Sequence, residues 1–285
     1  KNDEREILNR AYPTPYFFSA RVFSQIDLVS IELQKVYRQT DSVFVSVLDH
    51  IRTNTAGAAD LQLLNTRYGS HIEESEADMY ITLATRRDTV DSINEKKLAE
   101  LAGEPITFEG SIEGDFPESS LPTSQELVLK PGAQIIFIKN DFDRRWVNGT
   151  IGVIAGIDEE EETIYVITDD GKECDVKRES WRNIRYRYNE KTKEIEEEVL
   201  GSFTQYPIRL AWAITVHKSQ GLTFSRVVID FTGGVFAGGQ AYVALSRCTS
   251  LDGIQLKKPI NRADIFVRPE IVNFAGRFND RQAID

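Results

Sequence analysis

The stretch Ala213-Ile-Thr-Val-His-Lys-Ser-Gln-Gly221, followed by Ala241-Tyr-Val-Ala-Leu-Ser-Arg247, decides the fold of this chain. Nearly every polar side chain in the two stretches is of a type that contacts phosphate oxygens, and both stretches lie among strongly apolar residues. Polar groups that directly follow buried strands are typical of ligand sites in α/β proteins. The 285 residues contain no Gly-x-x-x-x-Gly-Lys-Ser/Thr phosphate loop. The two stretches therefore predict phosphate binding on an α/β fold without that loop.

Outward from these stretches, predicted strands and helices alternate. Residues 79–85 predict a buried strand, and residues 88–102 predict a helix closed by Gly103 and Pro105. A strand followed by a helix is the unit from which α/β domains are built. Residues 31–52 have a helical period that breaks near Gln39-Thr-Asp41, where Thr40 or Asp41 can cap a new helix. The C-terminal part predicts strands at 206–211, 227–231 and 253–256, with a helix at 241–246.

The middle of the chain has a different pattern. Residues 103–129 are rich in Gly, Pro, Ser and Glu and predict a long surface loop. After this loop, short strands are separated by turn signals at Asn148-Gly149 and Asp170-Gly171, a pattern that predicts a small barrel. The barrel strands are expected at 133–139, 149–157, 163–168 and 172–176.

Composition excludes several classes of protein. The apolar fraction of 41% suffices for a large core, and no apolar run reaches the roughly 18 residues of a transmembrane helix. The first residues, Lys1-Asn-Asp-Glu-Arg-Glu, contain no hydrophobic signal region. The two cysteines and three histidines show no zinc-ligand spacing, and unpaired thiols suit a reducing compartment. We therefore expect a cytoplasmic protein that has no membrane partner.

The net charge of −11 is unevenly distributed along the chain. Residues 205–262 carry seven Lys and Arg against two acidic residues, whereas residues 100–129 carry seven acidic residues and no Lys or Arg. This polarity suits a protein that holds one nucleic-acid strand in a basic groove while its acidic outside repels duplex. A solvated acidic surface without function is the alternative interpretation of the acidic runs.

The two opening stretches resemble, almost residue for residue, the fifth and sixth motifs of RecD-like superfamily-one DNA helicases, and most of all those of the PIF (petite integration frequency) helicases. Leu33-Gln-Lys-Val-Tyr-Arg-Gln39 resembles the fourth motif, and Trp146-Val-Asn-Gly149 resembles a further family motif. The resemblance implies an α/β fold, a RecA-like doubly wound parallel sheet with an inserted small SH3-like β-barrel. It divides the chain into a tail of a first RecA-like domain (1–30), the first part of a second RecA-like domain (31–139), the barrel insert (140–204), and the second part of that domain with a C-terminal tail (205–285).

The resemblance also implies an activity. Such enzymes hydrolyse ATP with Mg²⁺ and move 5′ to 3′ on single-stranded DNA as monomeric motors. They unwind duplexes and often G-quadruplexes, which connects them with DNA repair and telomere maintenance. A protein of this kind is expected at the nucleoid of a bacterium, or in the nucleus or mitochondrion of a eukaryote. The motifs that hold the phosphates and Mg²⁺ belong to the first RecA-like domain, so that domain is an expected partner and the isolated chain is expected to be inactive. No metal ligands are expected within this chain. A non-catalytic single-stranded-DNA-binding or regulatory fragment and a part of a conjugative relaxase–helicase are the alternatives.

Two arginines are the expected catalytic residues. The resemblance implies that Arg38 and Arg247 reach the γ-phosphate of ATP and that Gly221 also contacts the nucleotide. Arginine suits this role because its planar, permanently charged fork binds phosphoryl oxygens bidentately. The alternative for Arg38 is a solvated helix face, and the alternative for Arg247 is a structural interaction with the dipole at the C-terminus of a helix.

A second set of residues is expected to contact the DNA backbone. Thr215 can cap a short helix that presents His217 and Lys218. General-base chemistry is the weaker interpretation of His217, because no nucleophile and carboxylate accompany it. For Thr85-Arg-Arg87, ordinary surface arginines explain the pattern as well as DNA contacts do. For Asn148, the alternative to a DNA contact is a simple hairpin turn with Trp146 in the core. The full set of expected DNA contacts is Thr85, Arg86, Asn148, Thr215, His217, Lys218 and Ser219.

Overall fold

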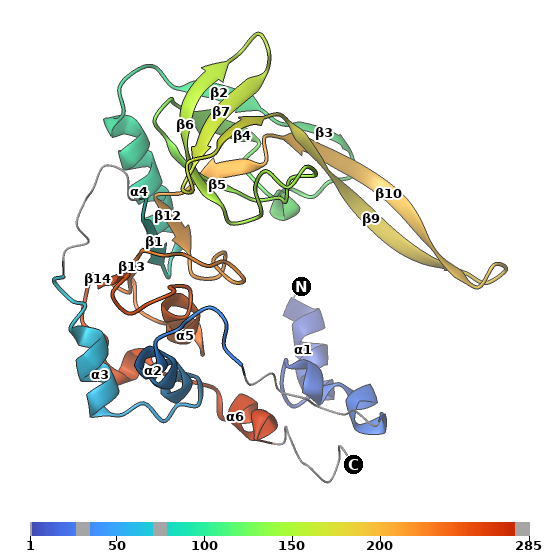
Figure 1. Cartoon of the computed structure of the whole chain (residues 1–285). Helices are drawn as coiled ribbons and strands as arrows, with labels where there is room; N and C mark the ends of the chain where they lie inside the picture. The colour runs from blue at the N-terminus through green and yellow to red at the C-terminus, as the bar shows by residue number, and fades with distance from the viewer. Residues whose placement is uncertain (1, 27–34, 71–78, 277–285) are drawn as a thin grey trace.

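A four-stranded parallel sheet is the centre of the computed structural model, which describes residues 2–26, 35–70 and 79–276. Its strand order is β12-β1-β13-β14, and every neighbouring pair is parallel (Figure 1). β1 and β13 are buried along their whole length, as strands covered on both faces require. The sheet confirms the predicted α/β class. Its strands are β1 (Ile81–Ala84), β12 (Ala213–Thr215), β13 (Val227–Asp230) and β14 (Ile254–Leu256).

Helices flank the parallel sheet (Figure 1). The helix predicted to restart after Gln39 does so at Asp41, whose Oδ1 accepts a hydrogen bond from Val43 N at 2.9 Å and caps the helix. Its buried residues Phe44, Val47, Leu48 and Ile51 follow the helical period and pack in the main core. The helices are α1 (Asn2–Ala11), α2 (Ser42–Arg52), α3 (Ala58–Asn65), α4 (Arg87–Glu100), α5 (Gln240–Leu245) and α6 (Pro269–Ala275), with short 3₁₀ helices at Phe17–Ser19, Arg21–Gln25, Glu118–Ser120 and Arg262–Asp264.

A second, antiparallel sheet has the strand order β11-β5-β6-β7-β8. Gly171 adopts a φ of +79° in the turn between β7 and β8, as the Asp-Gly signal predicts. The sheet is wider than the predicted insert of 140–204, because β5 and β11 pair with each other outside those bounds. It encloses its own apolar core. Its strands are β5 (Gln134–Phe137), β6 (Ile151–Asp158), β7 (Thr163–Thr168), β8 (Glu173–Val176) and β11 (Ile208–Leu210).

The predicted long loop at 103–129 is wrong for much of its length. It contains β2 (Ile106–Glu109), β3 (Ser111–Gly114) and β4 (Glu126–Leu129), and β2 pairs with β4. The physical reason is that a few apolar side chains, among them Phe108 and Leu127, reach the core of the second sheet although their neighbours are polar. Strands of this kind cannot be predicted from the composition of the segment alone.

A long β-ribbon projects from the second sheet (Figure 1). It consists of β9 (Glu179–Asn189) and β10 (Glu194–Gln205), which pair antiparallel, with β3 on the far edge of β10. Near its tip the ribbon is exposed on both faces, as the consecutive exposed residues Tyr186 and Arg187 of β9 illustrate. The sequence did not predict this ribbon, because strands exposed on both faces show no alternation of apolar and polar residues.

The N-terminal segment is attached to the rest of the chain through aromatic rings. Phe274 of α6 stacks on Phe18 with ring centroids 4.3 Å apart and meets Phe17 and Phe23 edge-on. The predicted tail at 1–30 therefore packs on the C-terminal helix in its described part. Within the described residues, no helix is both long and apolar enough to cross a membrane.

Candidate functional site

The fold brings Arg38 and Arg247 together from distant parts of the sequence. Arg38 precedes α2 in an irregular segment, and it donates from Nε to Thr223 Oγ1 at 2.8 Å and from Nη1 to Ser246 O at 3.3 Å. The alternative of a solvated helix face is therefore wrong for Arg38. Arg247 follows α5 and is only 8% exposed. Both guanidinium groups are thus held beside the same short backbone segments.

Arg247 is fixed by three hydrogen bonds. Its Nη1 donates to Leu222 O at 3.2 Å, and its Nη2 donates to Ser246 Oγ at 2.8 Å. Its Nε donates to Val243 O at 2.9 Å, so Arg247 also interacts with the C-terminal turn of α5, as its structural alternative requires. An arginine has five N–H groups. Among the described residues, two N–H groups of Arg247 and three of Arg38 have no acceptor.

The two arginines form an uncompensated pair of positive charges. Burial lowers the pKa of Arg247, and the charge of Arg38 lowers it further. In the part of the chain that the structure describes, neither guanidinium pairs with a carboxylate. Buried cations without anionic partners are costly, and an anionic ligand would relieve that cost. The pair is therefore suited to bind phosphoryl oxygens.

Gly221 lies directly before the residues that hold the two arginines. It adopts a φ of +83°, which residues other than glycine rarely adopt, and it is exposed. Leu222 O binds Arg247, and Thr223 Oγ1 binds Arg38. The structure thus places all three predicted ATP residues in one region.

A second group of predicted residues gathers at the carboxyl edge of the parallel sheet. Thr85 and Arg86 follow β1, and Arg86 Nε donates to Gly233 O, which follows β13, at 3.0 Å. The side chain of Thr85 is buried, and its hydroxyl has no hydrogen-bond partner among the described residues. An open pocket of about 500 Å³ lies over this edge, lined by Thr85, Arg86, Arg87, Asp88, Gly233, Gly234, Val235 and Phe236.

The segment after β12 presents two of its predicted DNA contacts to solvent. It forms consecutive turns in place of the expected short helix, and Thr215 Oγ1 accepts a hydrogen bond from Lys218 N at 3.3 Å. His217 and Lys218 are exposed, and the ring of His217 lies 6.3 Å from that of Phe236 at the pocket. The predicted capping contact of Thr215 is therefore present on a turn.

Ser219 corrects the predicted set of DNA contacts. Its side chain is fully buried, and its hydroxyl donates to Val216 O at 2.7 Å. Val216 O also accepts a longer hydrogen bond from Ser219 N at 3.3 Å, so the hydroxyl reinforces a turn that the backbone already forms. The side chain is thus part of the turn and does not face a ligand.

Lys218 belongs to a cationic cluster that the sequence prediction missed in part. Protein atoms crowd its ammonium group although the residue as a whole is exposed. This desolvation, with repulsion from Arg209 and Arg87, lowers the pKa of Lys218 to about 8. The only available sequence signal for Arg209 was the basic balance of 205–262. Arg87 also forms an ion pair with Asp91 at 3.5 Å, and the three cations with this one carboxylate leave a net positive group that favours a polyanionic ligand.

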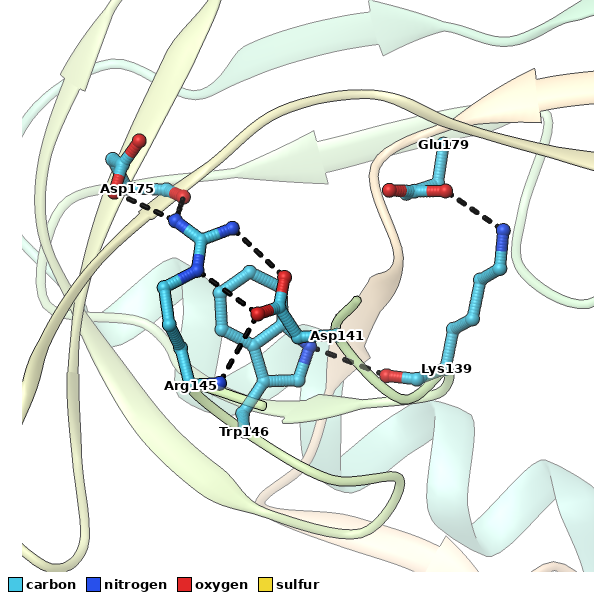
Figure 2. A network of polar contacts seen from close by, with 6 residues as sticks. All are labelled: Lys139, Asp141, Arg145, Trp146, Asp175 and Glu179. Carbon is cyan, nitrogen blue, oxygen red and sulfur yellow. Dashed lines mark hydrogen bonds and ion pairs between the residues drawn. The ribbon is translucent and has the colours of Figure 1, made fainter. Parts of the chain in front are cut away.

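A network of polar contacts holds the loop between β5 and β6 in place (Figure 2), and Asn148 belongs to the same loop. Arg145 binds Asp141 through Nε at 3.0 Å and Nη2 at 2.8 Å, and its Nη1 binds Asp175 Oδ1 at 2.8 Å. Because of the bond to Arg145, the pKa of Asp141 is lowered. In the same loop, Trp146 is a core residue that stacks on Phe137 at 4.3 Å, as the structural alternative predicts.

The same loop approaches the segment that holds the arginines. Asn148 is exposed, and its N–H donates to Asn140 Oδ1 at 2.7 Å. A Cβ added to Gly149, which has a φ of +100°, would lie 2.6 Å from Leu222 Cδ2. The loop therefore packs on the stretch between the two groups of candidate residues. No cluster of three or more His, Cys, Asp or Glu in the described ranges could hold a metal ion.

Comparison with known proteins places this site in context. No protein-family model matches the chain. The chain is 31% identical over 254 residues to the ATP-dependent DNA helicase Pif1 of Bdellovibrio bacteriovorus, a match that covers 87% of this chain and 54% of that protein. It is 34% identical over 250 residues to human ATP-dependent DNA helicase PIF1, covering 86% and 37%. The chain thus spans about half or less of the length of these curated relatives.

Solved structures show the same likeness. Pif1 from Bacteroides in complex with ADP-AlF4 superposes with a TM-score of 0.84 at 35% identity, covering 99% of this chain and 64% of that one. Bacteroides Pif1 in complex with ADP-AlF3 and single-stranded DNA gives a TM-score of 0.73 at 35% identity, with the same coverage. Together with the parallel sheet, the likeness confirms the predicted RecA-like α/β fold. The SH3-like character of the insert stays a prediction.

Proposed function

From the homology of this chain to the Pif1 helicases, we propose that it forms part of the motor of an ATP-dependent DNA helicase. Its role is to supply Arg38 and Arg247 to the nucleotide and a cationic surface to single-stranded DNA. We further propose translocation from 5′ to 3′, unwinding of duplex and G-quadruplex DNA, and action as a monomer, as the helicase motifs imply.

The uncompensated pair of arginines is the observation that supports this proposal most. The N–H groups of Arg38 and Arg247 that have no acceptor among the described residues suit the oxygens of a transferring phosphoryl group, whose charge they would stabilise. Bound ATP would supply the phosphoanhydride bond that is broken. Neither a phosphate loop in the 285 residues nor a metal-ligand cluster in the described part accompanies the arginines. We therefore propose that other parts of a longer protein hold Mg²⁺ and most of the ATP.

The proposed path of the DNA strand follows the carboxyl edge of the parallel sheet. His217 and Lys218 are exposed there, and Arg86 lines the open pocket beside them. Contacts from such side chains to phosphates read no base sequence, as a translocating motor requires. The exposed ring of Phe236 at the pocket offers a surface on which a base can stack.

A non-catalytic single-stranded-DNA-binding protein is the second candidate. The absence of a phosphate loop from the 285 residues favours it for this chain taken alone. The two candidates agree on DNA binding and differ on hydrolysis, so ATPase measurements separate them.

The test compares the longer protein with its arginine variants. Arg38→Ala or Arg247→Ala should lower the kcat of DNA-stimulated ATP hydrolysis by about three orders of magnitude, with a much smaller change in DNA affinity. Arg247→Lys should not restore full activity, because an ammonium group cannot form the planar fork. The chain alone should show no steady hydrolysis. Near-normal turnover of both alanine variants would refute the assignment of the arginines, and absence of hydrolysis in the longer wild-type protein would favour the non-catalytic candidate.

A further inference from the structure

Gln39 is buried between the two segments that carry the candidate arginines. Its Nε2 donates to Ser246 O at 3.0 Å and to Cys248 O at 2.8 Å. These two carbonyls belong to the residues on either side of Arg247. The amide NH₂ group has two hydrogens, so both are used on this one stretch of backbone.

Arg38 shares an acceptor with Gln39. The carbonyl oxygen of Ser246 accepts from Gln39 Nε2 and also from Arg38 Nη1 at 3.3 Å. Arg38 and Gln39 are neighbours in the chain, whereas the residues they bind lie some two hundred positions away. The side chain of Gln39 therefore ties the backbone beside one arginine to the backbone beside the other.

Something must hold the two arginines together against their own repulsion. Both guanidinium groups are positive, the charge of Arg38 acts on Arg247, and no carboxylate in the described part of the chain neutralises either. Gln39 supplies a neutral link, so it fixes the pair without cancelling the charge that a phosphate would need. A carboxylate in its place would cancel part of that charge.

We propose, on the basis of the function proposed above, that Gln39 is a positioning residue that sets the spacing of Arg38 and Arg247 for phosphoryl transfer. It acts through the two arginines and does not itself bind the nucleotide. A misplacement of about 1 Å in a catalytic group costs up to roughly a hundredfold in rate, so loss of the two hydrogen bonds of Gln39 should lower turnover strongly.

The test uses the longer protein with Gln39→Met, which keeps the length of the side chain and removes both hydrogen bonds. Gln62→Met, on the exposed surface of α3, is the matched control. Gln39→Met should lower the kcat of DNA-stimulated ATP hydrolysis by about 10- to 100-fold, with DNA affinity within about twofold of wild type. The control should change neither quantity.

A double-mutant cycle separates positioning from general destabilisation. In an Arg38→Ala/Arg247→Ala background, Gln39→Met should cost less than about a further twofold, because both arginines through which it acts are gone. An equal loss in both backgrounds, or a kcat within about twofold of wild type in the single variant, would refute the proposal. If Gln39→Met does not fold, Gln39→Asn keeps the amide one methylene shorter, and the same cycle applies to it. Absence of hydrolysis in the wild-type longer protein would instead refute the proposed function.

Discussion

Lys218 should make DNA binding by this chain sensitive to pH near 8. Desolvation of the ammonium group, with repulsion from Arg209 and Arg87, lowers its pKa from 10.5 to about 8. Lys218 is therefore charged below this pH and loses its charge as the pH rises through it. A DNA phosphate beside the ammonium group would favour the charged form and raise the pKa again. DNA affinity should consequently fall as the pH rises from 7 to 9.

The size of the effect follows from linkage between proton and DNA binding. If the phosphate restores the ordinary pKa of 10.5 in the complex, the affinity at pH 9 should be about tenfold lower than at pH 7. This is an upper limit, because Lys218 is exposed and solvent screens its interactions. Lys218→Arg should bind equally at both pH values, since a guanidinium group keeps its charge throughout.

The assay is fluorescence anisotropy of this chain with a labelled oligodeoxyadenylate at constant ionic strength. Adenine is chosen so that the bases do not titrate in this range. The pH dependence of the wild type should exceed that of Lys218→Arg, and Lys218→Ala should bind weakly at pH 7 and lose the dependence. Equal pH slopes for wild type and Lys218→Arg would refute both the perturbed pKa and the phosphate contact.

Two further predictions concern stability. Asp141 has a lowered pKa in the folded chain, so its bond to Arg145 stabilises the fold above pH 3.8 and loses this effect as the pH falls through the lowered pKa. Asp141→Asn should therefore lower the free energy of unfolding by about 1–2 kcal/mol near pH 7 and by less in acid, as urea titrations at several pH values would show. An undiminished difference near pH 3 would contradict this. Replacing the exposed end of the ribbon, residues 184–200, by Asn-Gly should leave the Tm unchanged in calorimetry, whereas a clear decrease would mean that the ribbon contributes to the core.

Local signals in the sequence predicted β1, β13 and β14 of the parallel sheet and the helices α2, α4 and α5. The predicted strand at 206–211 belongs instead to the second sheet as β11, and β12 and α3 were not predicted. The buried strand at 79–85 and the cap at Asp41 depend on neighbouring residues alone, and the structure has both. The strands within 103–129 could not be predicted in this way, because only the distant second core explains their few buried side chains. The ribbon of β9 and β10 was not predicted either. Its distal end has no buried face, so its sequence shows no alternation of apolar and polar residues.

The site residues that belong to recognisable sequence motifs were predicted, whereas those that only the fold brings together were not. Arg38 and Arg247 were expected near one ligand, and their shared contact at Ser246 agrees with that. Arg209 lies on an edge strand of the second sheet, and nothing local connects it with Lys218. Whether a serine side chain faces solvent or bonds within its own turn depends on backbone geometry. For this reason the prediction of Ser219 as a DNA contact was wrong.

The corrected position of Ser219 bears on how the two ligands affect each other. Lys218 is a proposed DNA contact, and Leu222 and Thr223 in the same segment bind the two arginines. The five Cα–Cα steps from 218 to 223 span at most about 18 Å even when extended, and residues 218–221 are folded into turns. The buried hydroxyl of Ser219 fastens these turns to Val216 O. Because the segment is this short, we infer that displacement of the arginines by a nucleotide reaches Lys218, the proposed DNA contact, through the backbone of 218–223.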